Sequence, residues 1–166
     1  MIPENSLAVN DTELNVTTQT ADTTTATEMQ LVTFHVGELL LGIPIEFVQE
    51  INRNLDMTLV PHAPDHVRGV INLRGEVTTV VDLGKVLGFS PTEIATGSRN
   101  IIVRFNEETI GLLVDSVADI LTIKTAEIAE TPANVPAGDG RYFNGVHRTG
   151  DALIVILDVE EVLATS

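Results

Sequence analysis

The sequence predicts a mainly β protein, made of small barrels or a β-sandwich, in which one structural plan occurs twice. Short apolar runs alternate with glycine-containing turns along most of the chain, which is typical of antiparallel strands. The sequence also matches itself, because an offset of 76 residues places Gly69-Val70 on Gly145-Val146. A second offset, of 69 residues, places Leu41-Gly42-Ile43 on Ile110-Gly111-Leu112. Matched segments of this kind indicate duplicated structural units.

The composition predicts that the two halves share one aliphatic core. The chain has 166 residues, so each half alone would be marginally stable. Hydrophobic residues make up 43% of the chain, with no Trp and a single Tyr. We therefore expect a common hydrophobic seam of Val, Ile and Leu, and one folding unit.

The charge balance excludes several classes of partner. The chain has 24 acidic and 9 basic residues and a formal net charge of −15, which disfavours binding to nucleic acid or anionic lipid. It has no Cys, so neither disulfides nor thiol chemistry are expected. The sequence shows neither a signal peptide nor an apolar run long enough to span a membrane. We expect a soluble cytoplasmic protein.

Residues 1–28 are predicted to be a disordered acidic tail, followed by a domain over residues 29–164. The tail has five acidic residues, eight Thr, and no Lys or Arg. Such a segment buries too little apolar area to offset the entropy of ordering it. The alternative is a docking peptide that acts through Leu14 and Val16.

The first half is predicted to contain two β-hairpins and two short helices. The hairpins turn at Gly37-Glu38 and Arg74-Gly75, and Asp82 can cap a short helix. Ile45, Val48 and Ile51 recur at helical spacing, which predicts a helix with Glu46, Gln49 and Glu50 facing outward. The expected elements are strands 31–36, 39–43, 67–73 and 76–81 and helices 45–51 and 83–87.

The second half repeats this plan with one difference. Alternating apolar residues over 117–123 predict a strand where the first half predicts a helix, and propensity alone does not decide between them. The difference between the two offsets is an insertion, most simply within 131–142. Asp158 starts the final helix, with Glu161 completing an acidic capping box. The other expected strands are 100–105, 109–114, 143–148 and 152–157.

No motif predicts an enzyme, a cofactor or a metal site. His62 and His66 have the spacing of a helical zinc pair, but Pro64 lies between them and no Cys or obvious third ligand accompanies them. No Ser lies in a nucleophile motif, and Gly138-Asp139-Gly140 lacks the Lys that a phosphate loop needs. Adjacent acidic residues in the chain are most simply exposed to solvent rather than catalytic.

Arg74 is the most informative charged residue of the segment 67–77. It occupies a predicted turn next to Gly75, in a chain with few cations. It either lies in solvent, with a local pair to Glu76, or binds a carboxylate of a partner, for which a guanidinium is well suited. The residue pattern leaves both interpretations open. Gly69 indicates a bulge or a close backbone approach.

The segments VRGVINLRGEVTTVVDL (67–83), LVTFHVGELLLGIPIEFVQEI (31–51) and IGLLVDSVADIL (110–121) closely resemble the CheW family of chemosensory coupling proteins. The resemblance covers roughly Gln30 to Leu163. The same domain occurs in the CheA histidine kinase and in CheV, but this chain shows no kinase or receiver segment. It departs from the family in its tail and at Pro44 and Gly84.

The resemblance implies two intertwined five-stranded SH3-like β-barrel subdomains. It also implies a non-enzymatic adaptor with two partners, the cytoplasmic tip of methyl-accepting chemotaxis receptors and the regulatory domain of the CheA histidine kinase. Recruitment to receptor arrays at the inner membrane follows from this. Kinase-facing residues are not assigned. The family's receptor contacts fall on Val48, Glu50, Gly69 and Arg74, with Asn72 as a neighbour.

Two alternatives stay open at this point. The same adaptor could serve a pilus-linked or developmental chemosensory system rather than flagellar taxis. A small hydrolase or ligand-binding barrel would instead need a polar pocket between the halves, for example around Asp115 and Asp119.

Overall fold

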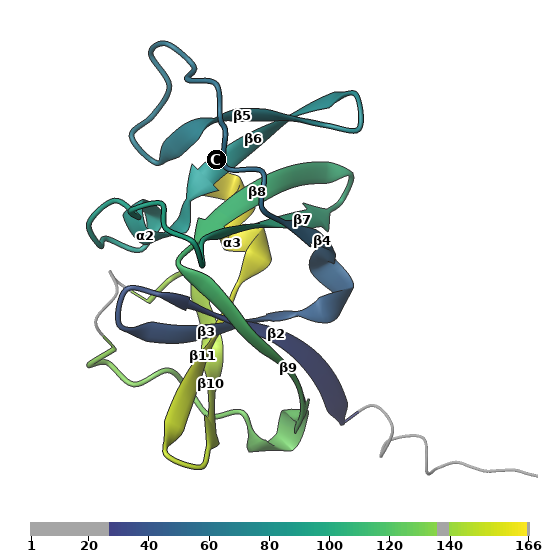
Figure 1. Cartoon of the computed structure of the whole chain (residues 1–166). Coiled ribbons are helices and arrows are strands. Elements are labelled where there is room, and N and C mark those ends of the chain that lie inside the picture. The colour runs from purple at the N-terminus through teal and green to yellow at the C-terminus, as the bar shows by residue number, and fades with distance from the viewer. Residues whose placement is uncertain (1–26, 136–139, 166) are drawn as a thin grey trace, which may run out of the picture.

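The computed structural model, which describes residues 27–135 and 140–165, confirms the mainly β prediction. Figure 1 shows two sheets stacked one above the other. Sheet I, the upper one, has the order β4-β7-β8-β6-β5, and sheet II has the order β10-β11-β3-β2-β9. Sheet I consists of β4 (Val48–Asn52), β5 (Val67–Leu73), β6 (Glu76–Asp82), β7 (Arg99–Phe105) and β8 (Glu108–Val114). Sheet II consists of β2 (Glu28–Val36), β3 (Leu39–Pro44), β9 (Ser116–Lys124), β10 (Phe143–Thr149) and β11 (Ala152–Leu157).

The helices are short and follow the ends of strands. The α-helices are α2 (Leu83–Val86) and α3 (Val159–Thr165), and the 3₁₀ helices are η1 (Ile45–Phe47) and η2 (Thr125–Glu127). Asp82 accepts a hydrogen bond from the Lys85 backbone N–H, and Asp158 accepts one from Glu161 N–H, so both predicted caps are confirmed. The predicted capping box is wrong in its second half, because the Asp158 backbone N–H donates to the Tyr142 carbonyl and the Glu161 carboxylate accepts from Arg141 instead.

The two halves are intertwined, because each contributes strands to both sheets. The first half supplies three strands of sheet I and two of sheet II, and the second half supplies the remainder. Parallel pairs β6·β8 and β11·β3 join the halves, with Val80 opposite Gly111 and Ile156 opposite Gly42. The offset of 76 maps Val80 onto Ile156, and the offset of 69 maps Gly42 onto Gly111, so the two pairs are equivalent. The duplication is therefore confirmed in three dimensions. The two five-stranded sheets fit the expected SH3-like subdomains.

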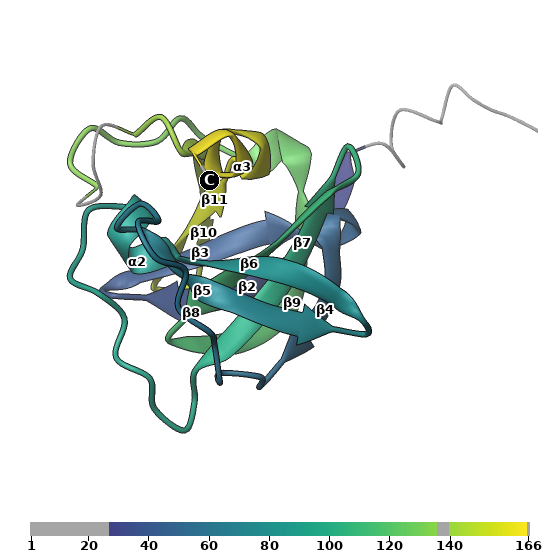
Figure 2. The ribbon, with the colours of Figure 1, turned by 90° about the horizontal axis from the view of Figure 1, so that it is seen from above.

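The largest core lies between the two sheets and forms the hydrophobic seam that the sequence predicts. It includes Phe34 and Leu41 from sheet II together with Ile101 and Leu112 from sheet I, all fully buried. Figure 2 shows from above how the two sheets cross, with α3 beside β10 and β11. Each sheet also has a small core of its own on its other face. These consist of Leu31, Ile123, Ile154 and Ile156 in sheet II and of Ile71, Val80, Ile102 and Leu113 in sheet I.

The predicted helix over Ile45–Ile51 is wrong. Only Ile45–Phe47 form a 3₁₀ turn after Pro44, and Val48–Asn52 form β4, which pairs with β7. Pairing with a neighbouring strand outweighs the local helical spacing, as tertiary context often does. The expected faces change as well, because Ile51 is 38% exposed while Glu50 is half-buried. The corresponding strand of the second half, β9, is confirmed.

Strand β2 already includes Glu28, which pairs with Lys124, although this residue was predicted as the end of the tail. The remaining tail residues 1–26, including Leu14 and Val16, and the segment 136–139 within the predicted insertion lie outside the described residues. No helix within 27–135 and 140–165 is long and apolar enough to cross a membrane.

Candidate partner-binding surface

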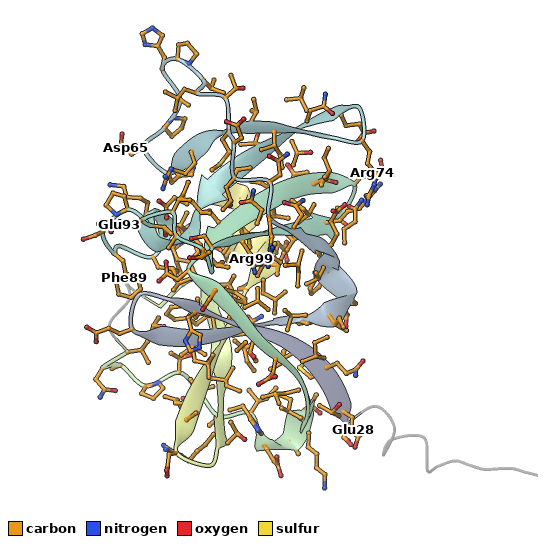
Figure 3. All side chains as sticks on the ribbon, in the orientation of Figure 1. Glu28, Asp65, Arg74, Phe89, Glu93 and Arg99 are labelled. Atoms are coloured by element: carbon orange, nitrogen blue, oxygen red, sulfur yellow. The ribbon has the colours of Figure 1, made fainter. Side chains whose placement is uncertain are left out.

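The hairpin between β5 and β6 presents Arg74 at its tip. Arg74 and Gly75 both have positive φ, 52° and 88°, which defines the two-residue turn that matches strand twist. The Asn72 side-chain oxygen accepts a hydrogen bond from Gly75 N–H at 2.9 Å. Asn72 therefore fixes the turn and so the direction of Arg74. Figure 3 shows Arg74 at the end of sheet I that lies opposite to Asp65 and Glu93.

Arg74 is ion-paired with Glu50 rather than with Glu76. Its Nη1 lies 2.5 Å from Glu50 Oε2, and Asn52 Nδ2 donates to the other oxygen of this carboxylate at 3.4 Å. Strands β4 and β5 are opposite edges of sheet I, so the pair shows that the sheet curls and brings its two ends together. The Arg74 side chain is 71% exposed against 21% for Glu50. Such an exposed pair contributes little to stability, about 0–1 kcal/mol.

Three of the five expected receptor contacts, Glu50, Asn72 and Arg74, come together at this end of sheet I, whereas a bulge between Val48 and Glu50 turns Val48 to the other face of the sheet. Val48 is half-buried and packs against the shared core. Asn72 is exposed. It forms, together with Glu50 and Arg74, the surface that we call the β4–turn surface: Glu50, Asn72 and Arg74.

Gly69, the fifth expected contact, is buried and has a local structural role. It follows a bulge in β5 and has a φ of 150°. A Cβ atom at this position would lie 2.5 Å from the Thr58 carbonyl oxygen, because residue 58 bridges to Val70. Gly145 repeats this arrangement beneath Ala129 in sheet II, with a φ of 151°. The predicted bulge and close approach are confirmed.

A buried polar network at the other side of sheet I was not predicted. Asp82 is fully buried and accepts hydrogen bonds from Arg68 Nη1 at 3.0 Å and from both the N–H and hydroxyl of Thr92 at 2.9 Å. Arg68 also donates to the Thr92 carbonyl at 2.7 Å. The network ties β5, β6 and the segment before β7 together. Its residues satisfy one another, which indicates a structural role.

The residues of the alternative sites do not converge. His62 is exposed and His66 half-buried, and no group of three metal-ligating side chains occurs within the described ranges. The Asp115 carboxylate accepts from Gly37 N–H at 2.9 Å, which holds the β2–β3 turn. The Asp119 backbone exchanges hydrogen bonds with the Thr33 hydroxyl. Both acids therefore support local backbone structure.

Comparison with known proteins identifies the family. The CheW-like domain model matches residues 30–166. The chain is 34% identical to the chemotaxis protein CheW of Rhizobium meliloti, over 80% of this chain and 86% of that one. It is 29% identical to protein FrzA of Myxococcus xanthus, over 84% and 88% of the two chains. The crystal structure of the scaffolding protein TtCheW from Thermoanaerobacter tengcongensis superposes with a TM-score of 0.72 at 32% identity, covering 78% of this chain and 83% of that one. This chain therefore belongs to the CheW-like domain family.

Proposed function

We propose that this protein is a non-enzymatic chemotaxis adaptor that couples methyl-accepting receptors to the CheA histidine kinase in signalling arrays. The observation that carries the proposal is the family match, which spans nearly the whole described domain and includes several chemotaxis proteins. Through its receptors the adaptor is recruited to arrays at the inner membrane.

In this proposal the β4–turn surface binds the helical cytoplasmic tip of a receptor. Arg74 supplies an exposed guanidinium, and only its Nη1 is used by Glu50. A guanidinium has five N–H donors, so Arg74 can bind a carboxylate of the receptor without leaving Glu50. Val48, which is half-buried at the start of the same strand β4, supplies apolar contact where it is exposed. Gly69 acts indirectly, because its close approach to Thr58 shapes the strand that leads to the turn.

The regulatory domain of CheA would pack against an exposed end of one subdomain in a pseudo-symmetric manner, on residues that are not assigned here. Coupling then requires no chemistry by the adaptor itself. The intertwined strands and the shared core link the two sheets into one unit. A receptor that binds one part of this unit can therefore bias the geometry of a kinase bound at another, with a coupling free energy of about 1–3 kcal/mol.

The test compares the full chain with its Arg74→Asp and Arg148→Asp variants. Arg148 is an exposed cation on β10 of the other sheet, so its variant changes the net charge equally. Each protein is assayed by pull-down with the cognate receptor cytoplasmic fragment and, separately, with the regulatory domain of CheA. Circular dichroism monitors folding.

We expect wild type to bind both partners, Arg74→Asp to lose receptor binding alone, and Arg148→Asp to retain both. Absence of wild-type binding to either partner would refute the adaptor function. Unfolding of Arg74→Asp would instead show that Arg74 has a structural role. Equal losses of receptor binding in the two variants would show that only the change in net charge matters.

A further inference from the structure

The open end of sheet I contains a cavity that receives side chains from all five strands. Its volume is about 260 Å³. Leu73 and Thr78 form its base, next to the small core of sheet I. Two arginines from different hairpins lie at its rim. We call it the arginine pocket, lined by Gln49, Leu73, Arg74, Glu76, Thr78, Arg104 and Thr109.

Arg104 is the arginine of this pocket whose guanidinium has no hydrogen-bond or ion-pair partner among the described residues. It is exposed on β7, opposite Thr109 of β8. The chain has only nine basic residues and a net charge of −15. A free arginine beside the Arg74–Glu50 pair therefore brings two of these few guanidiniums to one cavity.

The duplicated half shows that the fold does not require these charges. Arg104 pairs with Thr109 in the same register in which His35 pairs with Leu40 in sheet II. Likewise Leu73 faces Glu76 where Thr149 faces Ala152. A cavity of about 490 Å³ in sheet II shares three of these positions, occupied by His35, Leu40 and Ala152, and is lined mostly by apolar side chains. At these three shared positions the pocket of sheet I therefore has Arg104, Thr109 and Glu76 in place of His35, Leu40 and Ala152.

We infer that the arginine pocket is a subsite for a carboxylate side chain of the receptor tip, and that Arg104 is the second guanidinium that binds it. The inference rests on the proposed receptor-binding function and extends it to a residue outside the β4–turn surface. Two guanidiniums at one cavity favour a carboxylate because each can donate two parallel N–H groups to its oxygens. Charge complementarity thereby specifies an acidic position on the partner.

Glu76 provides a second test of the inference, in which the receptor affinity should change in the opposite direction. It lies on the rim of the same pocket, is exposed, and forms no ion pair within the described residues. A like charge beside a bound carboxylate weakens binding. Neutralising Glu76 should therefore strengthen receptor binding, whereas truncating Arg104 should weaken it.

The experiment measures the affinity of full-length wild type and the Arg104→Ala, Glu76→Gln and Arg148→Ala variants for the cognate receptor cytoplasmic fragment. Calorimetry at low and high salt gives both the affinity and its salt dependence. We expect about fivefold weaker binding for Arg104→Ala and a severalfold gain for Glu76→Gln. Arg148→Ala should match wild type. The salt dependence should be shallower for Arg104→Ala, because one charge contact is missing.

Failure of wild type to bind the fragment would refute the proposed function itself. If wild type binds and Arg104→Ala binds equally well, only the carboxylate subsite is refuted. Weakening by Glu76→Gln would also overturn it. If Arg104→Ala instead loses the regulatory domain of CheA and keeps the receptor, the pocket belongs to the kinase and the inference is wrong.

Discussion

Substitution of Gly69 by alanine separates a structural from a contact role for this residue. The added Cβ would lie 2.5 Å from the Thr58 carbonyl oxygen and 3.1 Å from Met57 Cβ. The backbone would also have to hold a φ of 150°, which L residues rarely adopt. Either the strand moves away from residue 58, or the two hydrogen bonds between Thr58 and Val70, both 2.9 Å, are broken.

The expected loss of stability follows from these two costs. Backbone strain at such a φ costs about 1–3 kcal/mol. Steric overlap with a backbone atom that cannot rotate away costs about 1–3 kcal/mol more. Gly75→Ala provides the matched control, since its φ of 88° carries strain but no atom lies within 4 Å of the new Cβ. Gly69→Ala should therefore lose about 2–6 kcal/mol and Gly75→Ala about 1–2 kcal/mol.

The assay is urea unfolding followed by circular dichroism, with the free energy taken by linear extrapolation. Gly145→Ala serves as a second control, because its Cβ would lie 2.7 Å from the Ala129 oxygen in the equivalent bulge. It should be as destabilised as Gly69→Ala although it lies in the other sheet. Equal stability of Gly69→Ala and Gly75→Ala would refute the steric reasoning. A fully stable Gly69→Ala that loses receptor binding would identify Gly69 as a direct contact.

The remaining predictions concern the network, the seam and the turn. Asp82→Ala should cost about 3–5 kcal/mol in urea unfolding, because it leaves Arg68 without its buried carboxylate; a loss below about 1 kcal/mol would contradict this. Leu112→Ala should cost about 2–5 kcal/mol and preserve a single transition in calorimetry, since Leu112 lies in the shared core. Two separate transitions would show that the sheets unfold independently. Arg74→Ala should change the free energy of unfolding by less than about 1 kcal/mol, and a larger loss would show that its pair with Glu50 holds the curled sheet together.

Much of the fold could be predicted because strand patterns and turns are local. The hairpins, the helix caps and the duplication all appear in the structure. The segment Ile45–Ile51 could not be assigned from its own spacing, because three apolar residues fit both a short helix and a half-buried strand. The duplication favours a strand for the second part of this segment. The offset of 69 residues places Glu50 on Asp119, within the segment 117–123 that does read as a strand.

The candidate surface was less predictable because it depends on contacts across the sheet. The pair of Arg74 with Glu50 forms only when sheet I curls and brings β4 to the β5–β6 turn. Arg104 has no local signal, since an exposed arginine near a hairpin end is common. Its significance arises from the strand order, which places β7 and β8 between β4 and the β5–β6 hairpin.

The duplication separates the residues that the fold requires from those that it merely accommodates. Several positions with the same residue in both halves have structural roles. Gly69 and Gly145 approach a backbone closely, Gly42 and Gly111 leave room for neighbouring side chains, and Asp82 and Asp158 cap a helix. Charged positions of one half that are not repeated in the other include two at the open end of sheet I, where Arg74 and Arg104 correspond to Gly150 and His35 of sheet II. Both ends share one backbone, so under the proposed adaptor function their different chemistry fits a different partner at each end.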